Sequence, residues 1–186
     1  MIHFKRNIAT AILSLAILQM ALAQGKFLTN DGYIRFFSHT PIEDITAENN
    51  KVSGVIDAAT GEVAIIVRMT EFRFEKKLMQ EHFNENYVES EKFPKSTFNG
   101  TITDNQVVDY STPGTYRVQV EGEMNIHGVT QKIQSGGTIQ VTAEGIVTRA
   151  VFMLNPEDYD IRIPGVVRRN IAEEMEVTVD MTFFPI

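Results

Sequence analysis

Apolar and polar residues alternate along most of this chain, with the period of two that is typical of a strand buried on one face. The clearest case is residues 175–183, where every second side chain is apolar and the intervening ones are acidic or threonine. Comparable patterns predict strands over residues 33–40, 52–57, 63–70, 97–103, 115–122, 138–143 and 146–155. Roughly eight strands joined by short turns predict an all-β fold, a closed antiparallel barrel whose lumen holds side chains or one ligand.

One stretch departs from this pattern and predicts a helix. Met79, Phe83 and Tyr87 recur every four residues with Leu78 beside them, which makes one apolar stripe, and Pro94 ends the run. An amphipathic helix among strands is expected to pack over a sheet face or across the open end of a barrel. A membrane barrel would alternate in the same way with its apolar face outward. The helix and the lack of aromatic girdles at strand ends favour a water-soluble barrel with an apolar interior.

Four stretches are less regular. Residues 24–31 are expected to be a frayed leader, residues 42–50 to be a short strand or a loop, and residues 166–173 to be a second short helix or a loop. Residues 146–155 are apolar on both faces in part, so something is expected to cover the outer side of that strand.

The first 23 residues have the features of a secretory signal peptide. Lys5 and Arg6 precede an apolar run over residues 8–22, and Ala21-Leu22-Ala23 is an A-x-A cleavage site that leaves Gln24 as the first mature residue. The alternative is a membrane anchor, for which the apolar run is short and polar-interrupted. We therefore predict a periplasmic or secreted protein with one domain over residues 24–186 and no stable transmembrane anchor.

The net charge and the cysteine content limit the kinds of partner and covalent attachment that this chain is expected to have. Removing the leader takes two of the 17 lysines and arginines and none of the 24 acidic residues, which leaves a net charge of −9. An acidic surface repels phosphate backbones and anionic headgroups, so nucleic acid and electrostatic docking on a membrane are not expected. The chain has no cysteine, so it forms no disulfide and carries no lipoprotein anchor.

No motif of catalytic or metal chemistry is present. His39, His82 and His127 remain after the leader, and no pair of them is spaced for a metal on one element. The chain has no G-x-S-x-G, no cysteine nucleophile and no phosphate-binding glycine loop. The sequence therefore predicts a protein that is not an enzyme and uses no metal or cofactor.

His127 precedes Gly128 at a predicted turn, and turn chemistry favours a side chain that bonds the backbone. The alternative is a residue at the barrel rim that contacts the polar head of a ligand. Residues 158–160 are favoured as acidic turn residues over a site. Three arginines follow that would suit an acidic headgroup but are favoured as solvated surface: Arg162, Arg168 and Arg169.

Three motifs resemble those of the YceI-like family, particularly its shorter secreted form. EHFNENYVES-x-KFP-x-STF-x-G over residues 81–100 resembles its helix-to-strand segment. GEMNIHGVT over residues 122–130 resembles its hairpin, and DYDIRIP over residues 158–164 resembles a later segment. The resemblance covers the chain from about residue 32 to the end. It implies a lipocalin-like antiparallel barrel that holds a long apolar molecule, a polyisoprenoid or similar lipid, in its lumen.

The aromatic residues are compatible with two hypotheses about the interior of the barrel. A packed core explains them without a ligand, because one buried Phe already stabilises a fold by about 1.5–3 kcal/mol; the protein would then be an interaction or stress-response module. The family resemblance instead favours a cavity. On that interpretation six residues form its lining or lid: Phe74, Met79, Phe83, Tyr87, Phe98 and Phe152.

Overall fold

The structure is a computed structural model, and it describes residues 25–186. The signal peptide predicted over residues 1–23 lies outside the described residues, so its cleavage remains a prediction. Among residues 25–186, no helix is long and apolar enough to cross a membrane.

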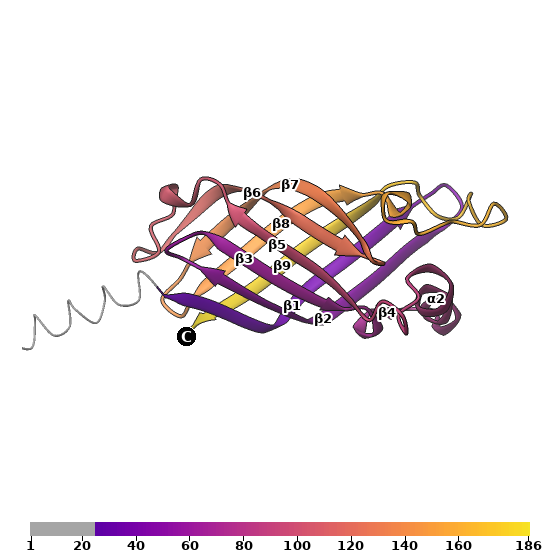
Figure 1. Cartoon of the computed structure of the whole chain (residues 1–186), viewed down its shortest axis with the longest axis horizontal. Helices are drawn as coiled ribbons and strands as arrows, with labels where there is room; N and C mark the ends of the chain where they lie inside the picture. Colours follow the sequence, from indigo (N-terminus) through magenta and orange to yellow (C-terminus); the bar gives the residue numbers. More distant parts are fainter. Residues whose placement is uncertain (1–24) are drawn as a thin grey trace, which may run out of the picture.

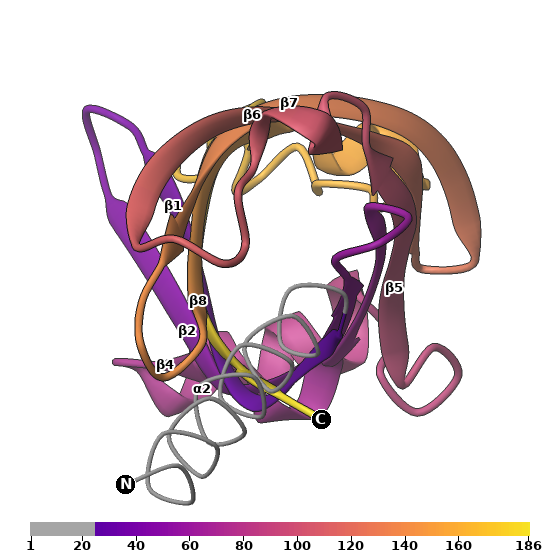
Figure 2. The same cartoon turned by 90° about the vertical axis from the view of Figure 1, so that its left-hand side faces the viewer.

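Eight long strands close into one antiparallel barrel, as the alternating pattern predicts. They are β1 (Lys26–His39), β2 (Asp44–Asp57), β3 (Glu62–Arg68), β5 (Lys95–Ile102), β6 (Gly114–Ile126), β7 (Val129–Val141), β8 (Ile146–Leu154) and β9 (Met175–Pro185). Their order around the barrel is β1-β9-β8-β7-β6-β5-β3-β2, and β2 pairs with β1 to complete the ring. Figure 2, a view along the barrel, shows this ring, and the two-residue β4 (Arg73–Phe74) adds to β2.

The two ends of the barrel differ. The C-terminus and the start of β1 lie at one end, which we call the closed end (Figure 1, left). The other end, the mouth, carries the β1–β2 turn, the segment between β3 and β5, the β6–β7 turn and the β8–β9 connection (Figure 1, right). Four short helical elements of residues 25–186 belong to the mouth: η1 (Met69–Glu71), α2 (Lys77–His82), η2 (Phe83–Tyr87) and η4 (Pro156–Tyr159). A fifth, η3 (Asn105–Val107), belongs to the closed end.

The closed end is filled by the β5–β6 connection. Phe27 of β1 stacks on Tyr110 with 5.9 Å between ring centroids, and Val108 is buried beside the core. The Tyr110 hydroxyl donates to Asn105 Oδ1 at 2.8 Å, and Asn105 Nδ2 donates to the Ala58 carbonyl at 2.9 Å. Burial raises the pKa of Tyr110 to about 12. This end is therefore tied to the turn between β2 and β3.

The backbone hydrogen bonds show which secondary structure is formed by the stretches whose sequence pattern was less regular. The expectation of a frayed leader over residues 24–31 is wrong from Lys26 onward, because Phe27 pairs with both Ile56 and Pro185 in neighbouring strands. Residues 44–50 belong to β2, which runs unbroken to Asp57. Residues 166–173 form turns and not a helix.

The outer face of β8 also differs from expectation. Val151 and Met153 are 57% and 55% exposed, and no described element packs on them, so the predicted cover is wrong for residues 25–186. The apolar residues on the other face, Phe152 and Leu154, pack against the core. A strand can therefore carry apolar residues on both faces and still expose one face to solvent, because isolated apolar side chains at a surface are tolerated.

Candidate ligand-binding cavity

The barrel encloses a cavity of about 430 Å³, which lies within the range of about 300–1,000 Å³ typical of ligand pockets. Inward-facing side chains of all eight long strands contribute to its wall, and loop residues of the mouth complete it. Its apolar wall reaches from Ile102 and Phe183, near the closed end, to Val167 in the β8–β9 connection. The interior is therefore partly unfilled, in contrast to the packing of an ordinary protein core.

Small inward residues on β5 to β8 explain why the interior is hollow. Gly100 pairs with Gly122, and Gly137 pairs with Ala150, all at inward positions. The Phe98 ring lies over the glycine pair, so close that a Cβ on Gly100 or Gly122 would come within 2.5 or 2.8 Å of its Cζ atom. The glycines let this ring lie against the wall, where a larger neighbour would push it into the lumen.

Four phenylalanines on the opposite side of the mouth form an aromatic cluster. Phe36 of β1 lies 5.4–5.7 Å, centroid to centroid, from Phe72, Phe74 and Phe83. Phe83 in turn lies 5.6 Å from Phe72 and 5.1 Å from Phe74. Ring pairs at these separations stabilise one another beyond their area of burial. The cluster therefore fixes the segment between β3 and β5 onto the barrel wall.

The predicted amphipathic helix is present at the mouth, and three residues of its stripe face the cavity. The fourth, Leu78, is 61% exposed and lies outside the wall, so its place in the stripe was predicted wrongly. Met79, Phe83 and Tyr87 all belong to the cavity wall. The helix begins as α2 and continues as a π-helical turn in η2, where the Val88 N–H donates to the Phe83 carbonyl at 2.9 Å. Such turns often occur at functional sites. We call residues 77–93, from α2 to the loop before β5, the lid segment.

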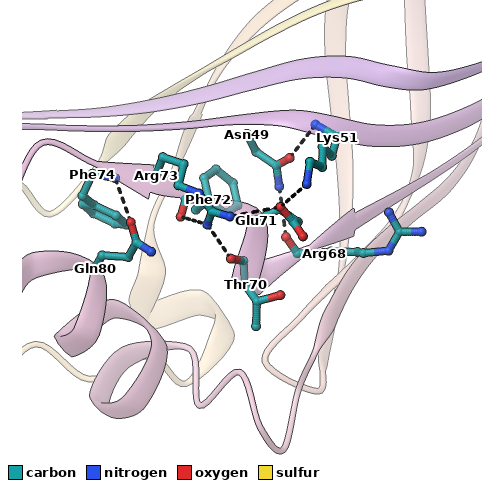
Figure 3. A network of polar contacts seen from close by, with 9 residues as sticks. All are labelled: Asn49, Lys51, Arg68, Thr70, Glu71, Phe72, Arg73, Phe74 and Gln80. Atoms are coloured by element: carbon teal, nitrogen blue, oxygen red, sulfur yellow. Dashed lines mark hydrogen bonds and ion pairs between the residues drawn. The ribbon is translucent and has the colours of Figure 1, made fainter. Parts of the chain in front are cut away.

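Polar contacts hold the stretch that precedes the lid segment, residues 68–74, to β2 (Figure 3). Asn49, which is fully buried, donates to the Arg68 carbonyl at 3.0 Å. Glu71 receives ion pairs from Lys51 at 3.1 Å and from Arg73 at 3.2 Å, and Lys51 chiefly lowers the pKa of Glu71. The Asn49 bond satisfies an amide that is fully buried, whereas the two ion pairs lie at the surface.

The mouth also contains one acidic group on the cavity wall. Glu43 of the β1–β2 turn lies 2.7 Å from Lys76 Nζ and accepts a 3.1 Å hydrogen bond from Asn170 Nδ2. Both bonds, Lys76 first, lower the pKa of Glu43, so its carboxylate is ionised at neutral pH. His82 and Asn170 border the cavity here as well. Arg149 also borders it, but its guanidinium pairs with Asp180 at 2.8 Å on the outer face.

Comparison with known protein families shows which family this chain belongs to. The model of the YceI-like domain family matches residues 26–183. The chain belongs to the YceI-like family. Comparison with curated proteins gives no match.

Solved structures share the fold of this YceI-like barrel at low sequence identity. A polyisoprenoid binding domain from Saccharophagus degradans, implicated in plant cell wall breakdown, is 15% identical with a TM-score of 0.76; the match covers 88% of this chain and 99% of that one. BcnA of Burkholderia cenocepacia is 13% identical with a TM-score of 0.68, over 81% and 95% of the two chains. The Campylobacter jejuni YceI protein is 15% identical with a TM-score of 0.60, over 77% and 86%.

The structure of this YceI-like barrel brings some of the predicted site residues to the cavity and leaves others outside it. The cavity wall includes all six proposed lining or lid residues: Phe74, Met79, Phe83, Tyr87, Phe98 and Phe152. His127 is not part of the wall; it lies in the β6–β7 turn, with both ring nitrogens bonded to other parts of the protein. The three arginines predicted as solvated surface are also outside the wall.

Other wall residues were not singled out by sequence reasoning, among them Phe36, Ile45, Ile133 and Met175. Their inward position follows from the strand alternation, but the alternation does not say that a void lies between them. Among residues 25–186, no group of three or more histidine or acidic side chains is placed to hold a metal ion.

Proposed function

We propose that this YceI-like protein binds a long apolar molecule, a polyisoprenoid or another lipid, in the lumen of its barrel, and that it acts as a periplasmic or secreted carrier. The unfilled apolar cavity of about 430 Å³ is the observation that carries the proposal. Its fold is that of a domain described as binding polyisoprenoids. The location rests on the signal-peptide features of residues 1–23.

Binding is driven by removal of the hydrocarbon from water. Each methylene buried contributes about 0.8 kcal/mol, so ten buried methylenes contribute about 8 kcal/mol. That free energy corresponds to a Kd of about 1 µM before the losses of freedom on association are counted. The inward strand residues of the wall supply an apolar surface with few polar groups to satisfy, so the shape of the lumen limits which chain is accepted.

The six predicted residues divide into two groups in this proposal. Phe98 and Phe152 line the lumen from β5 and β8. The four others, from β4 and the lid segment, contact the part of the ligand near the mouth: Phe74, Met79, Phe83 and Tyr87. The rival hypothesis, a packed barrel that acts only through protein partners, requires a filled interior, and the cavity argues against it.

Mass spectrometry tests the proposal directly. The exported protein is purified without detergent, measured under native conditions and then extracted with organic solvent to identify bound molecules. We expect a fraction of the protein to carry a lipid, and delipidated protein to bind geranylgeranyl anthranilate, a fluorescent ester of an isoprenoid alcohol. Protein that is empty in every preparation and refuses this probe would contradict a carrier role.

A further inference from the structure

Backbone strain in this protein is gathered at one place. Within residues 25–186, three residues other than glycine have positive φ: Glu89 at 44°, His127 at 52° and Asp160 at 56°. An L-residue in this left-handed region is strained, and such residues cluster at ligand clamps and switch regions. Glu89 follows the lid helix, His127 forms the β6–β7 turn and Asp160 ends η4, so all three belong to the mouth.

His127 connects these three elements to one another. Its Nε2 atom lies 2.7 Å from Glu89 Oε2 in the lid segment, and its Nδ1 atom lies 3.1 Å from the Tyr159 carbonyl oxygen in η4. Phe93, at the end of the lid segment, packs edge-on against the imidazole at 4.5 Å between centroids. The His127 side chain is only 11% exposed. We call Glu89, Phe93, His127 and Tyr159 the mouth clasp.

The two hydrogen bonds of His127 need two protons on its ring. A backbone carbonyl is only an acceptor, and so is an ionised carboxylate. The bond from His127, followed by the charge of Lys92, lowers the pKa of Glu89, so this carboxyl is ionised at neutral pH. Neutral imidazole has one N–H and would turn a lone pair toward one of its two acceptors. The complete clasp therefore requires the imidazolium form.

The charged surroundings of His127 come from two sides. Glu89 bonds it from the lid segment, where Lys92 lies over the Phe93 ring and also lowers the pKa of Glu89. Asp158 and Asp160 flank Tyr159 in the β8–β9 connection. The β6–β7 turn itself contributes no charged side chain within two residues of His127. The one ionised group that bonds His127 directly is thus the carboxylate of Glu89, which suits a cationic ring.

We propose that His127 is a positioning residue for ligand retention: its protonated ring holds the lid segment against η4 over the mouth, and loss of one ring proton loosens this closure. Histidine is the side chain whose charge most readily changes near physiological pH, so the clasp weakens as pH rises. Ligand release should then be faster at the higher pH. The role of the clasp in release rests on the proposed function, whereas the opening of the lid segment itself can be measured in the ligand-free protein.

Glu89→Gln is the decisive variant, because an amide can donate as well as accept. Neutral His127 can then donate to the Tyr159 carbonyl and accept from the amide, so both contacts survive deprotonation. We expect release of preloaded geranylgeranyl anthranilate into phosphatidylcholine vesicles to quicken about tenfold between about pH 5.5 and 8 in wild type. In Glu89→Gln the change should be less than about twofold, and His127→Asn should release quickly at both pH values.

His39→Asn is the matched control. His39 pairs with Asp44 at 2.6 Å at the same end of the barrel, but both side chains are exposed and the pair spans a single turn. This variant should keep the wild-type pH profile.

Hydrogen exchange of the Val88 and Ser90 amides, corrected for the intrinsic rate, gives the ligand-free measurement. These amides are bonded within the lid segment and their residues are buried. Their protection should fall at high pH in wild type and not in Glu89→Gln. Equal pH dependence of exchange in wild type and Glu89→Gln would overturn the clasp, whatever the probe does. Failure of the probe to bind, with the exchange difference intact, would overturn only the proposed function.

Discussion

Ala150→Leu tests whether the interior of the barrel is truly unfilled. Ala150 faces the lumen from β8 and lies opposite Gly137, so a longer side chain here extends toward empty space. Leucine adds three carbon groups, whose burial contributes about 2.4 kcal/mol at about 0.8 kcal/mol each. Ordering the longer side chain costs about 0.5–1 kcal/mol. The expected result is an increase of about 1–2 kcal/mol in the free energy of unfolding.

The same substitution should weaken ligand binding, because the new side chain occupies room that a hydrocarbon tail would use. Loss of about three methylene contacts reduces affinity by between about tenfold and a hundredfold. Urea unfolding measures stability, and titration with geranylgeranyl anthranilate measures affinity. Stability and affinity thus move in opposite directions, which is not expected of damage to the fold.

Ala64→Leu is the control for this experiment. Ala64 is exposed on the outside of β3, so the same added carbons meet solvent and should change stability by no more than about 0.5 kcal/mol. In a filled barrel, Ala150→Leu would overpack the core and lower stability by about 1–3 kcal/mol. That loss, with probe binding unaffected, would refute the reasoning.

Three further predictions concern the wall, the closed end and the mouth. Phe98→Ala should lower the free energy of unfolding by less than the about 3–5 kcal/mol that is typical of a Phe in a packed core, because Phe98 already borders a void. The same variant should bind the probe more weakly. A loss of stability above that range in urea unfolding would favour the packed alternative. Tyr110→Phe removes the hydrogen bond to Asn105 and should lower the free energy of unfolding by about 1–2 kcal/mol with unchanged probe affinity; a changed affinity would mean that the closed end takes part in binding. The folded-state pKa of Glu43 lies below its usual value of 4.5, so its bond to Lys76 stabilises the protein above that pH and is lost as pH falls through the lower value. Wild type should therefore lose thermal stability relative to Glu43→Gln as acid is added below about pH 4.5, and parallel melting curves would contradict this assignment.

Much of this architecture could be predicted from the sequence alone. Alternation of apolar residues is a local property of an extended chain, so it marks the strands and the face that each one buries. The four-residue recurrence of Met79, Phe83 and Tyr87 marks the helix for the same reason, and the structure places that stripe on the cavity. The three motifs around residues 81–100, 122–130 and 158–164 indicated the family that the match over residues 26–183 confirms.

The hollow interior and the mouth clasp were decided only by the tertiary structure. Gly100, Gly122 and Ala150 lie on three different strands, and only the register of the sheet puts such small residues on one side of the lumen, away from Phe36 on β1. His127 likewise meets its partners over 38 and 32 residues of sequence. Periodicity states which side chains share a face, but it carries no measure of the distance between opposite walls. That distance depends on how many strands close the ring and on which residues meet across it.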